Sequence, residues 1–386
     1  MKEEEGIVML VALMDSQYIS LTSNYSREQL LQLRKKQKFI CPQCKSELQL
    51  KIGKVKTPHF AHFRDANCHN LFSEGESETH LLGKLALYDF FKKAGKNVVL
   101  EPYLTSVSQR PDLLVQDQGS TYAIEFQCST IDPDLVIKRT SGYIQHSIHP
   151  YWLLNTPGKY YEEINCTKVI SLTKFEQQFI VNNDANTYLL TFNPQTKTFY
   201  YYNHLIHFRN NQFIAEIQRI PIQYQIFPFL QPKRMSFLKF LPLIKLYKKR
   251  TQAYVDNKIY ISTKGVKDIL LRSIYELKLN RFVMPIFLGL PTLYAKAMEM
   301  VAVEWQTALF YYGQIHQKRI LQFTIYDMEQ FIKWLNVEPS NTKIKSVNNY
   351  IQLLRDLNIE DVNKKIQEQI VFEKLHNQLV AIRLEN

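Results

Sequence analysis

The feature that most constrains the fold is a pair of strand-like segments on either side of a short turn. The segments are Pro111–Gln116 and Thr121–Cys128, and the turn between them reads Asp117-Gln118-Gly119-Ser120. A glycine-containing turn between two such runs is typical of a β-hairpin. If the two middle residues of the turn form the loop, counting back along both strands places Asp112 opposite Glu125.

Further elements are predicted on both sides of this hairpin. The run Ser73-Glu74-Gly75-Glu76 has the pattern of a capping box, and apolar residues follow it at helical spacing. The predicted elements, in order, are a helix over 73–95, a strand over 98–104, the two hairpin strands, a helix over 132–146 and a strand over 151–154. The order is therefore α-β-β-β-α-β.

Carboxylates and an amide gather on one face of the hairpin. Residues paired directly across two strands hold their Cβ atoms about 4.5–5.5 Å apart, and two carboxylates that close repel unless positive charge lies between them. Mg²⁺ would supply that charge. Gln127 shares a face with Glu125 because it lies two residues along the strand, and we expect Glu78 of the preceding helix to reach the same face. An amphipathic hairpin with one solvated face is the alternative.

These residues resemble the core of the PD-(D/E)xK nucleases. The resemblance rests on Arg110-Pro111-Asp112 and Ile124-Glu125-Phe126-Gln127 within an α-β-β-β-α-β order. It implies that Asp112 and Glu125 bind a catalytic Mg²⁺ or Mn²⁺ and that Glu78 orients a metal-bound water. Gln127 stands where that family usually has lysine. Lys84 could supply the missing positive charge, unless it is simply solvated.

A Cys/His cluster precedes this region. Cys41, Cys44, His59 and His62 have the spacing C-x2-C-x14-H-x2-H, which predicts a closed structural zinc site. The competing ligands are Cys68 and His69. A reduced cysteine pair in a turn is the alternative. The odd cysteine count, 5, favours a reducing compartment over a disulfide scaffold.

The charge distribution points to a polyanionic partner. The net charge is +12, and residues 232–282 contain 13 Lys or Arg against 3 Asp or Glu. This stretch has a helical pattern. The candidate DNA contacts are Arg110, Lys245, Lys248, Lys249 and Arg250, with Tyr247 and Tyr254 placed to stack on bases. A solvated helix face is the alternative for the basic cluster.

The chain is predicted to be an α/β protein with four parts. These are an N-terminal zinc-finger-like, β-rich module (1–72), a restriction-endonuclease-like core (73–160), a β-rich extension of that core (161–230) and a basic helical C-terminal domain (231–386). The acidic start of the chain argues against a secretion signal. The apolar run 7–14 is too short to span a membrane.

Taken together, the motifs resemble the competence protein CoiA family. The resemblance covers the Cys-x-x-Cys and His-Phe-Ala-His module, Ser77-Glu78-x-His80 with Lys84, the Arg-Pro-Asp run and Ile124–Ser129, and more weakly Glu304-Trp305-Gln306. It implies a cytoplasmic role in natural transformation of Gram-positive bacteria, where incoming single-stranded DNA recombines with the chromosome. A recombinase and other competence proteins would be partners.

Two functions follow from these observations. The first is a metal-dependent DNA endo- or exonuclease that hydrolyses phosphodiester bonds of incoming single-stranded DNA or of recombination intermediates. The second is a non-catalytic DNA-binding accessory that supports recombinase loading. The three carboxylates favour the first, whereas Gln127 and the basic C-terminal region are compatible with the second. Structural zinc and catalytic Mg²⁺ or Mn²⁺ are the expected cofactors.

Overall fold

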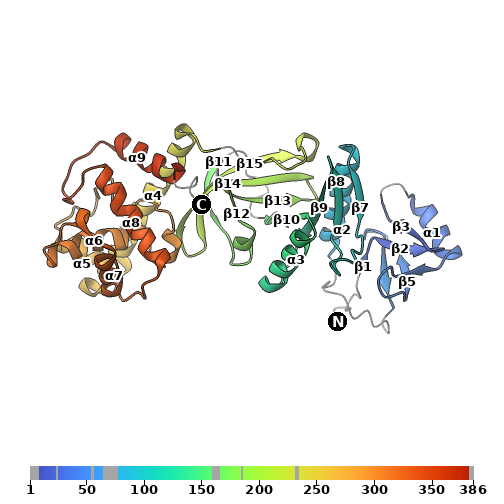
Figure 1. The fold of residues 1–386 in the computed structure, drawn as a ribbon. Helices are drawn as coiled ribbons and strands as arrows, with labels where there is room; N and C mark the ends of the chain where they lie inside the picture. Colours follow the sequence, from blue (N-terminus) through green and yellow to red (C-terminus); the bar gives the residue numbers. More distant parts are fainter. Residues whose placement is uncertain are drawn as a thin grey trace. The chain divides into compact units, whose positions relative to one another are not determined.

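A computed structural model describes residues 8–22, 25–53, 56–63, 77–158, 166–183, 186–230 and 234–381 (Figure 1). The chain divides into two compact units. Unit 1 contains residues 1–163, 190–201 and 219–230, and unit 2 contains residues 164–189, 202–218 and 231–386.

The N-terminal part of unit 1 is a six-stranded sheet, in the order β1-β6-β5-β4-β2-β3. Its strands are β1 (Val8–Met9), β2 (Val11–Met14), β3 (Gln17–Ser20), β4 (Phe39–Ile40), β5 (Glu47–Lys51) and β6 (His59–His62), with α1 (Arg27–Lys36) after β3. Only Leu10 separates β1 from β2, yet the two strands stand first and fifth in the order. The sheet must therefore curve, and it forms a half-barrel. The rings of Phe39 and Phe60, tilted by 47° with centroids 4.9 Å apart, lie in its core.

The predicted α-β-β-β-α-β order follows in the chain. The elements are α2 (Glu78–Lys93), β7 (Asn97–Leu100), β8 (Leu113–Asp117), β9 (Ser120–Gln127), α3 (Pro133–Gln145) and β10 (Ile148–Asn155). Helix α2 begins at Glu78 because the Ser77 side chain caps it, accepting the His80 backbone N–H at 3.2 Å. The predicted start at Ser73 lies outside the described residues.

The hairpin register agrees with the sequence prediction. Strands β8 and β9 are antiparallel, with Asp117 opposite Ser120 and Leu113 opposite Ile124. One more step along this register brings Asp112 opposite Glu125. Strand β10 then pairs with β9 in parallel, which the intervening helix α3 makes possible.

Gly83 lets helix α2 approach this sheet closely. A Cβ atom at Gly83 would lie 2.0 Å from the ring of Phe126 on β9. No side chain fits there, so glycine brings the first turns of α2, and the polar residues on them, down to the ends of β8 and β9.

The sheet continues beyond β10 through the β-rich region that the sequence predicts. The further strands are β11 (Cys166–Ser171), β12 (Val181–Asn183), β13 (Asn186–Asn193), β14 (Thr198–Arg209) and β15 (Gln212–Pro221). The order is β11-β15-β14-β13-β10-β9-β8-β7, with β12 paired to β13. The division between the two units falls inside strands β13, β14 and β15.

The C-terminal part of unit 2 is helical, as predicted. Its helices are α4 (Phe237–Ile261), α5 (Ile269–Glu276), α6 (Ala302–Ile315), α7 (Ile325–Trp334), α8 (Asn341–Asp356) and α9 (Glu368–Ala381). Almost all of α6 is buried, and Trp305 packs edge-on against Tyr350. Gln306 bonds both the N–H and the carbonyl of Leu290. None of the helices in the described ranges is long and apolar enough to cross a membrane.

Candidate functional site

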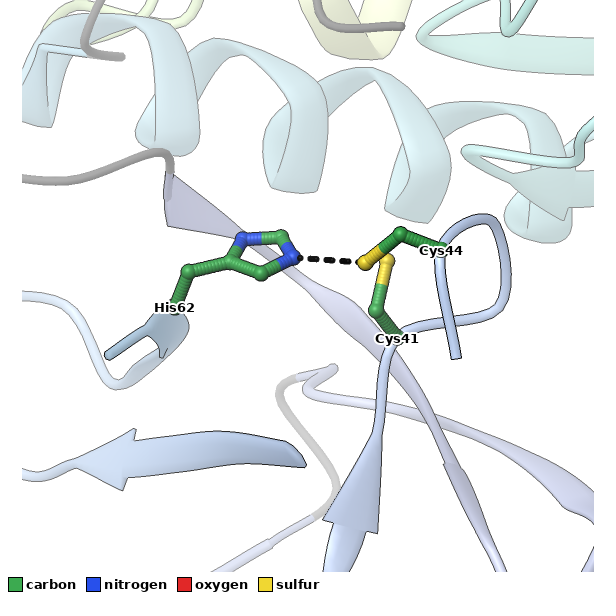
Figure 2. Close-up of side chains that lie close together, drawn as sticks. All are labelled: Cys41, Cys44 and His62. Atoms are coloured by element: carbon green, nitrogen blue, oxygen red, sulfur yellow. Dashed lines mark hydrogen bonds between the residues drawn. The ribbon is translucent and has the colours of Figure 1, made fainter. Parts of the chain in front are cut away.

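Cys41, Cys44 and His62 converge beside the N-terminal sheet (Figure 2). Their donor atoms all lie within 4.8 Å of one another, and the Cys44 Sγ is 3.3 Å from the His62 Nε2. The two cysteines share a tight turn after β4, in which the Lys45 N–H donates to the Cys41 carbonyl. Burial raises the pKa of the Cys41 thiol, so a cation is needed to hold it as a thiolate. Two thiols and an imidazole are zinc donors, and this cluster could bind that metal.

His59 does not join these three residues, and its prediction as a zinc ligand is not supported. Its Nδ1 lies 2.9 Å from the Thr57 carbonyl oxygen. The physical reason is strand alternation, because residues three apart on β6 point to opposite faces of the sheet. The competing ligands Cys68 and His69 lie outside the described residues.

Asp112 lies one residue before β8 and is held by three groups. Its Oδ2 accepts the backbone N–H of Phe126 at 2.8 Å and lies 3.2 Å from the His80 Nε2. Its Oδ1 lies 3.9 Å from the Lys84 Nζ. Burial would raise the pKa of Asp112, but His80, Lys84 and the Phe126 N–H outweigh it and hold that pKa well below its ordinary value. Asp112 is therefore an ionised carboxylate.

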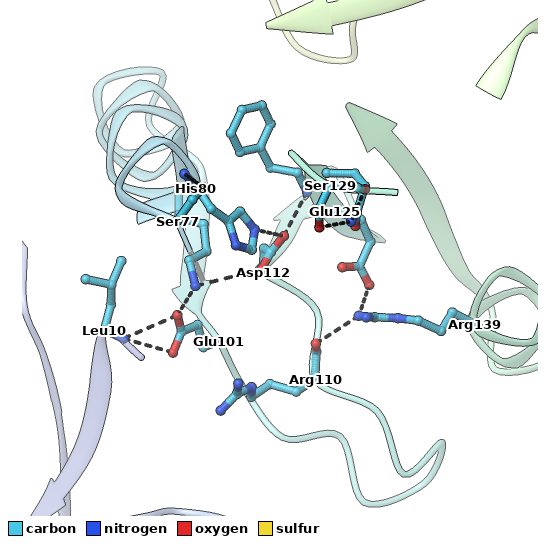
Figure 3. A network of polar contacts seen from close by, with 12 residues as sticks. Leu10, Ser77, His80, Glu101, Arg110, Asp112, Glu125, Ser129 and Arg139 are labelled. Atoms are coloured by element: carbon cyan, nitrogen blue, oxygen red, sulfur yellow. Dashed lines mark hydrogen bonds and ion pairs between the residues drawn. The ribbon is translucent and has the colours of Figure 1, made fainter. Parts of the chain in front are cut away.

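Lys84 connects Asp112 to the N-terminal sheet. The network of polar contacts around it includes Leu10, Glu101 and Asp112 (Figure 3). The Lys84 side chain is fully buried, which excludes the solvated alternative, and it forms an ion pair with buried Glu101. Both oxygens of Glu101 accept the backbone N–H of Leu10, at 3.1 and 3.3 Å. The single residue between β1 and β2 is thus tied to the carboxylate site.

Glu125 has a separate set of partners on helix α3. The Arg139 guanidinium forms an ion pair with it, and the Tyr143 hydroxyl donates to its Oε1 at 2.5 Å. Arg139 also donates to the Arg110 carbonyl at 3.0 Å. Burial raises the pKa of Glu125 to about 7, because the nearby Asp112 charge adds to desolvation while Arg139 and Tyr143 only partly oppose it.

Glu78 does not take the position expected of it, and Gln127 has a protein partner. The Glu78 carboxylate accepts the Thr57 backbone N–H at 2.9 and 3.1 Å and also the Thr57 hydroxyl, so it is turned toward the N-terminal sheet. Helical geometry instead brings His80, two residues further on, to Asp112. The Gln127 amide donates to the Ser129 carbonyl at 2.8 Å. Within the described ranges, the Cys/His cluster alone brings together three or more metal-binding side chains.

Comparisons with known proteins agree with these motifs. The family model "Competence protein CoiA, nuclease-like domain" matches residues 76–235, and "Competence protein CoiA, N-terminal domain" matches residues 22–71. The chain is 36% identical over 190 residues to "Competence protein CoiA" of Bacillus subtilis (strain 168). The chain belongs to the competence protein CoiA family. The alignment spans 49% of this chain and 49% of that relative, so about half of each protein is compared. No solved structure matches.

The basic C-terminal cluster of this CoiA family member is divided between surface and interior. Lys245, Lys249 and Arg250 are exposed, whereas Lys248 is half-buried and donates to the Leu288 carbonyl at 2.6 Å. Burial lowers the pKa of Lys248 to about 8. Tyr247 is fully buried, so the prediction that it stacks on a base is wrong.

The sequence prediction did not include Arg139 or Tyr143, and it included His80 only within the motif that resembles the CoiA family. The signal was present as i, i+4 spacing, since His80 and Lys84 share one face of α2, and Arg139 and Tyr143 share one face of α3. Glu101 gives no such signal. It lies in irregular backbone with φ of 47°, and only the fold brings it to Lys84.

Proposed function

We propose that this chain is a metal-dependent DNA nuclease that acts in natural competence. The observation that supports this most strongly is the position of Asp112 and Glu125, opposite each other across β8 and β9 in the segment matched by the nuclease-like model. On this proposal the core is of the restriction-endonuclease-like, PD-(D/E)xK type, and the substrate is incoming single-stranded DNA or a recombination intermediate.

The carboxylates would hold Mg²⁺ or Mn²⁺, which would polarise a phosphoryl oxygen and activate a water. Oxygen donors suit these ions. Asp112 is already ionised, and Glu125 has to lose its proton and share its charge with Arg139. Lys84 keeps a positive charge beside Asp112. We propose that it replaces the lysine expected at position 127.

The remaining assignments belong to the same proposal. Zinc bound by Cys41, Cys44 and His62 would stabilise the N-terminal module. The exposed Lys245, Lys249 and Arg250 would contact phosphates. Arg110, half-buried beside the site, would contact DNA there. The partners would be single-stranded or branched DNA, a recombinase and other competence proteins in the cytoplasm.

A second candidate function is a non-catalytic DNA-binding accessory that supports recombinase loading. The partners of three side chains favour it. Glu78 is occupied by Thr57, Gln127 by Ser129, and Glu125 by Arg139 and Tyr143. A site whose carboxylates already have protein partners can persist as structure without any catalysis.

Cleavage assays with Mg²⁺ or Mn²⁺ on single-stranded, duplex and branched DNA separate the two functions. Asp112→Asn should lower the cleavage rate by at least about 100-fold, because changes outside the ligand shell alone cost about 10- to 100-fold. The matched control is Asp117→Asn on the same strand, whose carboxylate pairs with Lys96 instead. Unchanged cleavage by Asp112→Asn would reject the carboxylate assignment. Binding without cleavage by the unaltered protein would favour the accessory.

A further inference from the structure

Unit 2 contains a polar cleft far along the chain from the carboxylates. Its volume is about 770 Å³, within the usual range for ligand sites. Four segments line it, namely the η2 region (Glu176–Phe179), the β14–β15 turn, helix α4 and the loop around η5 (Ala295–Met298) that leads to α6. The side chains that matter for its chemistry are Lys174, Gln177, Arg209, Tyr254, Lys258 and Lys296.

The cleft carries an excess of uncompensated positive charge. Lys258 is neutralised, since its Nζ lies 2.7 Å from Glu304 and 3.1 Å from Asp268. Lys174, Arg209 and Lys296, by contrast, form no ion pair with a carboxylate in the described part of the chain. Glu299 on the rim offsets one of these three charges. Cations that line one cavity without a carboxylate partner favour an anionic ligand.

Arg209 is held in a fixed orientation at the cleft. Its guanidinium lies over the Tyr254 ring, 5.4 Å from the centroid, and its Nε donates to the Gln212 side chain at 3.0 Å. The ring itself is fixed, because the Tyr254 hydroxyl donates to Glu304 at 2.8 Å. A planar guanidinium oriented in advance suits bidentate binding of a phosphate, and its open face suits stacking on a base.

Amides complete the rim of the cleft. The Lys296 ammonium donates to the Gln177 side-chain oxygen at 2.5 Å, and the Gln177 amide donates to Asn211 at 3.2 Å. The η5 turn that carries Lys296 is flanked by Tyr294 and Glu299, both with positive φ, at 62° and 55°. Such backbone persists where the surrounding structure holds it. These contacts therefore hold Lys296 at the rim of the cleft.

We propose that this cleft binds a phosphate-bearing nucleotide segment, as part of a single strand of nucleic acid. Arg209 would hold a phosphate and stack on a base, and Lys174 and Lys296 would neutralise neighbouring phosphates. The proposal rests on the function proposed above in that DNA is taken to be the substrate. It adds a binding site separate from the carboxylates.

Fluorescence anisotropy with a labelled oligodeoxythymidylate, without added Mg²⁺ or Mn²⁺, tests the cleft in the full chain. Arg209→Ala with Lys296→Ala should weaken binding by about tenfold and flatten the slope of log affinity against log salt by about 1.4, at about 0.7 per single-strand contact. The matched control is Lys264→Ala with Lys267→Ala, which removes the same charge from exposed residues of unit 2 outside the cleft. Arg209→Lys should give an intermediate loss, because it keeps the charge without the planar fork.

The outcomes separate the possible ligands and the two proposals. If the cleft and control variants lower the affinity for the strand equally, and both are folded with the same melting temperature, the proposed binding site in the cleft is overturned. Binding of dTMP that the cleft variant loses, together with unchanged strand binding by that variant, would overturn the strand and make a free nucleotide the ligand. Competition by inorganic phosphate but not by dTMP would overturn the assignment of a nucleotide as the ligand. If strand binding depends on the cleft but the protein cleaves no DNA, only the nuclease proposal is rejected. If cleavage depends on Asp112 but both charge variants bind the strand equally, only the proposed cleft site is rejected.

Discussion

The Cys/His cluster and the carboxylate site lie in the same unit but differ in the partners of their metal-binding side chains. Cys41, Cys44 and His62 bring two thiols and an imidazole within 4.8 Å of one another, and burial raises the pKa of the Cys41 thiol. Asp112 and Glu125 each have cations from the protein, which are His80 and Lys84 for the first and Arg139 for the second.

On the assignments proposed above, this difference separates a site that would need its metal to be stable from one that would be stable without it. Thiolates gathered without a counter-charge repel unless a metal binds them, so zinc and folding should be coupled there. The carboxylates are neutralised by side chains that fold with them. Metal binding at that site has to compete with Arg139 and His80, and it should add activity rather than stability.

The largest effect should come from removing zinc. Cys44→Ser should abolish equimolar zinc in elemental analysis and cost several kcal/mol in the N-terminal module, since structural zinc contributes about 10–16 kcal/mol of apparent binding energy in small fingers. Hydrogen exchange over residues 8–62 should rise. Cys166→Ser, outside the cluster, is the control. If the purified protein contains no zinc and Cys44→Ser does not change its stability, the proposed difference between the two sites is wrong.

The next effect should come from breaking the buried pair behind Asp112. Lys84→Met leaves Glu101 buried without its cation, which should lower the free energy of unfolding by about 3–5 kcal/mol. Adding Glu101→Gln should recover part of that loss in a double-mutant cycle. Lys96→Met breaks the more exposed pair with Asp117 and should cost about 1 kcal/mol or less. Equal losses in denaturant unfolding would mean that the carboxylate site is not held by its own cations.

The smallest effect is expected at Lys248, a half-buried lysine that, unlike Lys84, forms no ion pair with a carboxylate among the described residues. The folded-state pKa of Lys248 is about 8, below its ordinary 10.5. Between these values the unfolded chain binds more protons, so the free energy of unfolding should rise with pH across the window. After allowance for partial exposure the rise should be on the order of 1 kcal/mol. Lys248→Met should remove it, and exposed Lys249→Met should not. A slope that survives Lys248→Met in urea titrations would contradict this assignment.

Much of the local architecture could be predicted because it depends on neighbours in the chain. The Asp117–Ser120 turn determines the β8–β9 register, and that register alone puts Asp112 opposite Glu125. The α-β-β-β-α-β order and the C-terminal helices likewise follow from periodicity and turn residues. The short motifs carry the resemblance to the CoiA family.

Only the tertiary structure decided which charges meet. Whether His59 or His62 reaches the cysteines depends on which face of β6 turns to their loop. Glu101 meets Lys84 because α2 packs on β7, and Arg139 meets Glu125 because α3 connects two parallel strands. Tyr247 and Lys248 turn inward because α4 buries that side of its surface. In each case spacing along the chain limits where a side chain can point, while the element packed against it determines what the side chain meets there.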